Sequence, residues 1–130
     1  MGSRRIRVLI VDDHELFAEA LAAALSADDR IEPVGRGGTA LEGVALAEHL
    51  LPDVVLMDLH MPGLDGVDAT RMLARLCPSA RVVVVTASTS PDDRERALDA
   101  GAVTVLTKGV GADMLIDAVL DASSSYGCAA

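Results

Sequence analysis

Short runs of aliphatic residues recur along the chain and alternate with segments of helical spacing. Four runs are continuous and rich in β-branched residues, at 8–11, 54–57, 82–85 and 103–106, and a weaker fifth candidate spans 31–35. Continuous apolar runs of this length are typical of strands that are buried on both faces of a parallel sheet. The pattern therefore predicts a central parallel sheet.

Between the predicted strands, apolar residues recur at the three- and four-residue spacings of an amphipathic helix. The capping-box sequence at 39–42 opens one such helix, which we expect to end before Pro52. Ser90 and Pro91 supply a cap and a first-turn proline for another helix, and Gly101 follows its end. Strands and helices in alternation predict a single doubly wound (βα)5 domain of the α/β class, with helices on both faces of the sheet.

The length of 130 residues corresponds to one domain. We expect an amino-terminal tail at 1–5, the domain at 6–122, and a carboxyl-terminal tail or the start of a linker at 123–130. A hydrophobic fraction of 51% supports a buried core. No apolar stretch approaches the length of a membrane span, so no membrane contact is expected.

Charge and cysteine content restrict the partners and the compartment. Twenty acidic residues against 11 basic ones give a net charge of −9, and only 2% of the residues are aromatic. This balance repels phosphate backbones and offers no stacking platform, so no nucleic acid is expected to bind this segment. Cys77 and Cys128 are too few for a disulfide framework, which indicates a reducing, cytoplasmic location.

Polar residues stand directly after each of the predicted core strands. Asp12 and Asp13 follow the first, Asp58 follows the run at 54–57, and Thr86 and Lys108 follow the last two. The carboxyl ends of parallel strands form the ligand-binding edge of an open α/β sheet. The sequence therefore predicts a cluster of carboxylates, a hydroxyl and an ammonium group at that edge.

The chemistry of this cluster favours a hard cation and a phosphoryl group. Neighbouring carboxylates repel one another unless a cation or protons intervene. Oxygen ligands without a nearby cysteine favour Mg²⁺, which leaves coordination positions for phosphate oxygens. A carboxylate can act as the nucleophile that accepts a phosphoryl group, and added positive charge and hydrogen-bond donors stabilise that group.

Four segments carry a resemblance to a known family. These are Val-Leu-Ile-Val-Asp-Asp-His at 8–14, the segment 53–66 with Asp-Leu-His-Met-Pro-Gly, Val-Val-Thr-Ala at 84–87, and Gly-Ala followed by lysine at 101–108. Over residues 6–122 the chain resembles the receiver domain of bacterial two-component response regulators. The resemblance implies a flavodoxin-like sheet of strand order 2-1-3-4-5.

The resemblance also implies roles for the residues at this edge. Asp58 matches the phosphoacceptor, Thr86 the switch hydroxyl and Lys108 the phosphate partner. A Mg²⁺ ion would be held by Asp12, Asp13 and Asp58, together with the backbone carbonyl of His60. The phosphoryl donor would be a sensor histidine kinase, and the chain would be a signalling module and not an enzyme.

Finer features of the sequence resemble one subfamily of receivers, and this resemblance implies an output through transcription. The Asp-Asp-His start, and Lys108 followed by Gly109, resemble the NarL/FixJ subfamily, in which a helix-turn-helix domain usually follows the receiver. The chain is then either a stand-alone receiver or part of a longer regulator, and a second copy of the chain is a candidate partner in a homodimer. A haloacid-dehalogenase-type phosphatase is a rival, but its motif requires a second aspartate, which His60 replaces.

Two positions depart from the family pattern: Val105, and Ser88, two residues after Thr86, where the family often carries a residue that tunes the lifetime of the phosphoryl group. Val105 stands where receivers usually carry an aromatic switch residue, which keeps open a degenerate receiver that acts by protein contacts alone. We expect Val105 at the surface end of its strand, and the signal to leave through the 88–93 loop and the helix after it. His14, His49 and His60 are expected to face solvent, and residues 92–96 to form a solvated helical face. Cys77 is expected to be an inert residue at a helix end.

Overall fold

A five-stranded parallel sheet forms the centre of the protein. The computed structural model describes residues 4–128, and its strands are β1 (Ile6–Val11), β2 (Ile31–Gly37), β3 (Val54–Met57), β4 (Arg81–Thr86) and β5 (Thr104–Thr107). They pair in the order β2-β1-β3-β4-β5, and every pairing is parallel. The predicted doubly wound sheet and its strand order are confirmed.

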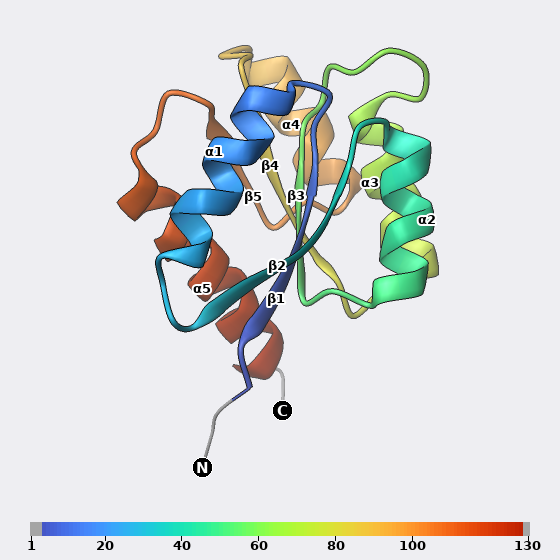
Figure 1. Ribbon diagram of the computed structural model, residues 1–130. Helices are drawn as coiled ribbons and strands as arrows, with labels where there is room; N and C mark the ends of the chain where they lie inside the picture. Colours follow the sequence, from blue (N-terminus) through green and yellow to red (C-terminus); the bar gives the residue numbers. More distant parts are fainter. Residues whose placement is uncertain (1–3, 129–130) are drawn as a thin grey trace.

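Helices cover both faces of the sheet, as Figure 1 shows. They are α1 (Glu15–Ser26), α2 (Ala40–Leu50), α3 (Gly66–Leu76), α4 (Pro91–Ala100) and α5 (Ala112–Cys128). Helices α1 and α5 pack on one face, and α2, α3 and α4 pack on the other. The chain therefore has three layers, with the sheet in the middle.

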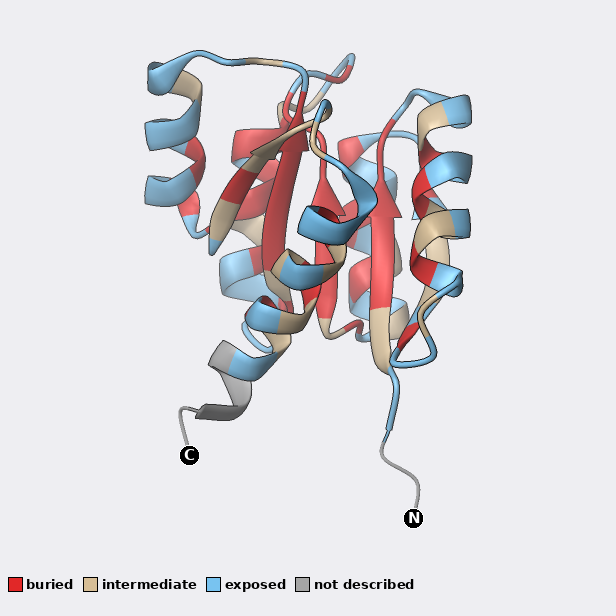
Figure 2. Cartoon of the chain, turned by 90° about the vertical axis from the view of Figure 1, so that its left-hand side faces the viewer, coloured by how far each residue is buried: buried red, intermediate tan, exposed pale blue. Residues whose placement is uncertain are grey.

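Alternate residues of each central strand point to opposite faces of the sheet. Val8 and Ile10 pack toward α1 and α5, whereas Leu9 and Val11 pack toward α2 and α3. All four are completely buried, and Figure 2 shows the central strands buried along most of their length. Burial on both faces explains why these strands are continuous apolar runs with no polar alternation.

The predicted helix caps form, but the Glu42 carboxylate bonds the amide of Gly38 and not that of the cap residue Thr39. Thr39 Oγ1 accepts a hydrogen bond from the Glu42 amide at 3.1 Å, and Ser90 Oγ accepts one from the Asp93 amide at 3.4 Å. The Glu42 carboxylate accepts from the amide of Gly38, which precedes the cap residue, at 2.6 Å. Together these bonds satisfy amides that the first helical turn leaves without a partner.

Two expectations differ from the structure. Val105 is buried, at 9% exposure, in the cluster that includes Ala97 of α4, so the expected surface position is wrong. The sequence did not show that α4 covers this end of β5. Helix α5 continues to Cys128 and thus past residue 122, where the domain was expected to end. Within residues 4–128, no helix is both long enough and apolar enough to cross a bilayer.

Candidate phosphorylation site

Backbone hydrogen bonds beyond the strand ends hold the predicted site residues at one edge of the sheet. The Asp12 amide donates to the last carbonyl of β2 at 3.0 Å, and the Asp58 amide donates to the last carbonyl of β1 at 3.0 Å. The Lys108 amide donates to the last carbonyl of β4 at 2.8 Å. Each residue is therefore fixed by the strand next to its own.

The carboxylates form one compact group. One oxygen each of Asp12, Asp13 and Asp58, with a ring nitrogen of His14, all lie within 4.8 Å of one another. Asp12 and Asp58 are 6% and 3% exposed, whereas Asp13 lies at the rim. Lys108 Nζ lies 2.9 Å from Asp12 Oδ2 and 3.6 Å from Asp58 Oδ2. The structure thus brings together the carboxylates and the ammonium group that the sequence predicted.

Burial makes Asp58 an unusual carboxylate. Loss of solvent raises its pKa above the ordinary value, and the neighbouring Asp12 raises it further, while Lys108 acts in the opposite direction. Its Oδ2 atom is buried and has no hydrogen-bond partner among residues 4–128. A buried carboxylate oxygen without a partner is energetically costly, so this atom favours the approach of a cation or a donor.

His14 points into the cluster, although its side chain is 64% exposed. Its Nδ1 atom lies 3.1 Å from Asp12 Oδ1, 3.3 Å from Asp13 Oδ1 and 3.2 Å from Lys108 Nζ. This nitrogen can donate to a carboxylate or accept from the ammonium group, but a single protonation state does not allow both. The expectation that His14 faces solvent missed these contacts, and its place directly after Asp12 and Asp13 was the available signal.

The donor set fits a hard divalent cation. Asp12, Asp13 and Asp58 offer oxygen atoms from neighbouring loops, and the unpartnered Asp58 Oδ2 lies among them. Mg²⁺ prefers such carboxylate oxygens and retains several waters. The backbone carbonyl of His60, the fourth ligand implied by the family resemblance, stays a prediction. The cluster is compatible with Mg²⁺ binding.

The side chain of His60 turns toward helix α4. Its Nε2 atom lies 3.0 Å from Asp93 Oδ2, and the same oxygen accepts from Ser88 Oγ at 2.7 Å. The hydrogen bond from Ser88 has the larger effect and the one with His60 the next, and together they hold the pKa of Asp93 below its usual value. The amide of Ser88 donates to Thr86 Oγ1 at 3.1 Å. Asp93 is therefore part of a network at the site, and not only of a solvated helical face.

Gly66 allows helix α3 to begin directly beneath the Asp58 loop. A Cβ atom at this position would lie 2.2 Å from the carbonyl oxygen of Asp58 and 2.6 Å from Leu59 Cα, both backbone atoms. The Gly66 amide donates to the Leu59 carbonyl at 3.0 Å. No other residue type fits this contact without moving the loop that carries Asp58.

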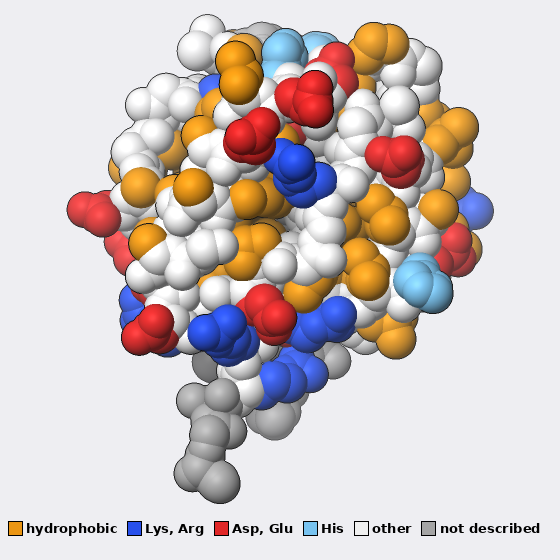
Figure 3. All heavy atoms as spheres, viewed as in Figure 1, with side chains coloured by type: hydrophobic (Ala, Val, Ile, Leu, Met, Phe, Trp, Pro, Cys, Tyr) orange, Lys and Arg blue, Asp and Glu red, His pale blue; other side chains and the backbone are white. Residues whose placement is uncertain are grey.

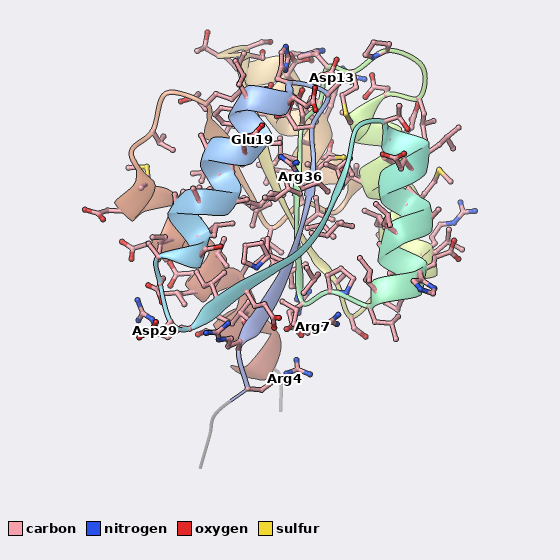
Figure 4. All side chains as sticks on the ribbon, in the orientation of Figure 1. Arg4, Arg7, Asp13, Glu19, Asp29 and Arg36 are labelled. Atoms are coloured by element: carbon pink, nitrogen blue, oxygen red, sulfur yellow. The ribbon has the colours of Figure 1, made fainter. Side chains whose placement is uncertain are left out.

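The two edges of the sheet differ in the charged side chains that they carry, although acidic residues such as Asp29 also lie near the lower edge. In Figure 3, arginine side chains gather at the lower edge, where β1 begins, and acidic side chains surround the upper edge. Figure 4 labels Asp13 at the upper edge and Arg4 and Arg7 at the lower one. The site edge is therefore anionic, which favours cations and disfavours nucleic acid phosphates.

Comparison with known proteins identifies the family. The response regulator receiver domain matches residues 8–120. The transcriptional regulatory protein LiaR of Bacillus subtilis is 42% identical over 118 residues, which are 91% of this chain and 56% of LiaR. The response regulator GacA of Pseudomonas aeruginosa is 40% identical over 114 residues, which are 88% of this chain and 53% of GacA.

Solved structures agree with the sequence relatives. The signal receiver domain of the putative response regulator NarL from Mycobacterium tuberculosis has a TM-score of 0.90 and 32% identity, over 94% of this chain and 98% of that one. The chain spans about half the length of LiaR and GacA. With its fold, its carboxylate cluster and these relatives, the chain belongs to the response regulator receiver domain family.

Proposed function

We propose that Asp58 accepts a phosphoryl group from a sensor histidine kinase, in a reaction that requires Mg²⁺, and that the phosphorylated domain controls a transcriptional output. The observation that carries this proposal is the buried Asp58 carboxylate, whose Oδ2 atom has no hydrogen-bond partner among the described residues and lies 3.6 Å from Lys108 Nζ. An oxygen without a partner is available to form a new bond.

The transfer step is a substitution at phosphorus. An oxygen of Asp58 forms the new P–O bond while the P–N bond to the imidazole of the kinase histidine breaks. The released imidazole keeps the electron pair of that bond and takes up a proton. Such reactions depend on positioning and on neutralisation of the charge on the phosphoryl oxygens.

Residues of this chain supply those two requirements. Lys108 brings a positive charge, and its Nζ already contacts Asp12 and approaches Asp58. Thr86 stands at the end of β4, next to β3, with a buried hydroxyl that can donate to a phosphoryl oxygen. Bound Mg²⁺ would be held by Asp12, Asp13 and Asp58, with the His60 carbonyl, and would neutralise phosphoryl charge.

Partners follow from the same assignment. The relatives LiaR and GacA are named as regulators, and the matched residues make up 56% and 53% of their lengths, which supports a transcriptional output outside the present sequence. We propose a cytoplasmic location, no binding of duplex DNA by this segment, and a possible homodimer. Val105 in place of an aromatic residue favours the second candidate, a receiver that acts by protein contacts without phosphorylation.

Intact-mass measurement after incubation with acetyl phosphate and Mg²⁺ tests the proposal. Wild type should gain the mass of one phosphoryl group, and Asp58→Asn should gain none. Asp68→Asn, which changes an exposed acid of α3, is the matched control and should be labelled like wild type. Equal labelling of Asp58→Asn and wild type would refute the assignment of Asp58. No labelling of wild type would favour the second candidate.

A further inference from the structure

Helix α4 has little hydrophobic attachment to the rest of the domain. Its buried residues are Ala97 and Ala100, and Leu98 is 38% exposed. Two alanine methyl groups contribute far less burial than the leucines and valines of the other helices. Other interactions must therefore hold α4 in position.

Polar bonds from residues 93–96 of α4 supply this attachment. Asp93 Oδ2 accepts from Ser88 Oγ at 2.7 Å and lies 3.0 Å from His60 Nε2. Arg94 Nη1 donates to the carbonyl of Val105 at 3.0 Å. Arg96 Nη2 lies 3.7 Å from Asp65 Oδ2, the cap of α3. Side chains within about one turn of α4 are thus joined to different neighbouring elements.

Asp93 differs from the other two because one of its oxygen atoms joins both loops that flank the phosphorylation site. His60 lies two residues after Asp58 in the loop that follows β3, and Ser88 lies two residues after Thr86 in the loop that follows β4. The side chain of Asp93 is 18% exposed, and its carboxylate oxygen contacts Ser88 Oγ and His60 Nε2. Ionised acceptors form the stronger class of hydrogen bond.

Ser88 connects this carboxylate to the switch hydroxyl. Its amide donates to Thr86 Oγ1 at 3.1 Å, while its own hydroxyl donates to Asp93. Under the proposed function, the Thr86 hydroxyl would turn toward a phosphoryl group on Asp58, at the end of the neighbouring strand β3. Because Ser88 is bonded to Thr86 on one side and to Asp93 on the other, a displacement of the Thr86 hydroxyl would strain one of these two bonds or move Asp93 together with α4.

We propose that Asp93 is a positioning residue that fastens the amino end of α4 to both loops of the unphosphorylated site, and that phosphorylation releases this contact. The release step rests on the proposed phosphorylation of Asp58. The contact stabilises the resting form only, so its removal should favour the phosphorylated form. Asp93 thereby sets how readily the domain switches.

Affinity for beryllofluoride, measured with Mg²⁺, tests the release. Asp93→Ala should bind this phosphoryl mimic about fivefold more tightly than wild type, the effect of one hydrogen bond lost from the resting form. Asp93→Asn retains an acceptor oxygen and should give an intermediate affinity. Asp92→Ala removes an acid from the same helical turn but breaks none of these bonds, and its affinity should stay within about twofold of wild type.

Amide hydrogen exchange of the unmodified protein tests the attachment. Residues 87–95 should exchange faster in Asp93→Ala than in wild type or Asp92→Ala, while the central strands remain protected. A His60→Ala/Ser88→Ala double variant removes the same two bonds from the loop side, together with the bond that Ser88 Oγ accepts from the Ser90 amide, and should also exchange faster over residues 87–95.

The outcomes separate this inference from the proposed function. Unchanged exchange in Asp93→Ala, or weaker binding of beryllofluoride by a folded Asp93→Ala protein, would overturn the role of Asp93 alone. A wild-type protein that binds no beryllofluoride would overturn the proposed function and the release step together. Faster exchange with tighter binding, both absent from Asp92→Ala, would support the inference.

Discussion

At the scale of single residues, the surroundings of Asp58 lower the stability of the folded protein. Asp58 is buried beside Asp12, and its pKa is raised mainly by loss of solvent. Its Oδ2 atom lacks a hydrogen-bond partner among the described residues. A buried carboxylate of this kind lowers the free energy of unfolding when it is ionised. The presence of Asp58 at the site therefore makes the fold less stable.

Asp58→Asn should therefore stabilise the protein at neutral pH, by about 1–2 kcal/mol. The folded-state pKa of Asp58 is raised, so the folded protein holds this proton to a higher pH than the unfolded chain does. Its contribution to stability is then largest in acid and declines as the pH rises from about 4 through the folded-state pKa. Asparagine has no carboxyl group to ionise, so the Asp58→Asn variant lacks this decline of stability with rising pH.

Urea unfolding between pH 4 and pH 7 measures this difference. The gap between Asp58→Asn and wild type should widen with rising pH. Asp99→Asn, an exposed acid of α4, should leave the curve unchanged. An Asp58→Asn protein less stable than wild type at neutral pH would contradict this account of Asp58.

Gly66→Ala should destabilise the domain by more than about 2 kcal/mol. Alanine in a helix is ordinarily more favourable than glycine, but here its Cβ would lie 2.2 Å from the carbonyl oxygen of Asp58. Displacement of that loop should also slow phosphorylation. Gly109→Ala, where no heavy atom lies within 4 Å, is the control for both unfolding and labelling rate. A gain in stability for Gly66→Ala would show that the contact is not restrictive.

At the scale of elements, β5 and α4 meet around a cavity of about 180 Å³. Its lining includes Thr86, Ser88, Arg94 and Val105. Val105 is buried, but one side of it faces this space and not packed atoms. Strand β4, which carries Thr86, therefore has room beside it, which an aromatic residue at position 105 would reduce.

Val105→Tyr should fold, with stability within about 1.5 kcal/mol of wild type, because the ring can occupy this cavity. Val84→Tyr is the matched control, since Val84 is fully buried and pairs with Val105 across the ladder. Overpacking at Val84 should cost at least about 2 kcal/mol in thermal unfolding. Equal losses for the two variants would mean that the cavity does not accept the ring.

At the scale of the whole molecule, charge is distributed unevenly. The chain carries a net charge of −9. The carboxylates of Asp12, Asp13 and Asp58 converge at the carboxyl edge of the sheet, while Arg4 and Arg7 lie at the opposite edge. Convergent carboxylates repel one another and weaken the fold until a cation binds. Cation binding and stability should therefore be linked.

Millimolar Mg²⁺ should raise the melting temperature of wild type, since a ligand that binds only the folded state stabilises it by mass action. Asp13→Ala removes one of the proposed ligands and should reduce this rise by more than half. Asp29→Ala, an exposed acid near the opposite edge, should keep the full rise. The same Mg²⁺ shift in Asp13→Ala and wild type would exclude Asp13 as a ligand.

The site residues and their meeting at one edge were predictable because these residues follow strands. Contacts between the site loops and α4 were not predictable. Asp12, Asp58 and Lys108 meet as expected, since parallel strands end at one edge. The bond of His60 to Asp93 joins residues separated by 33 positions, and no local pattern in the sequence indicates it. The burial of Val105 likewise depends on where α4 packs.

The sequence by itself determined the (βα)5 order, the parallel sheet and the edge on which the polar residues gather, because these follow from hydrophobic periodicity and from chain direction. Only the tertiary structure decided which side chains touch. The inward turn of His14, the unpartnered Oδ2 of Asp58 and the shared bonds of Asp93 arise where separate loops meet. Such contacts depend on distances between elements, which the order of residues along the chain does not specify.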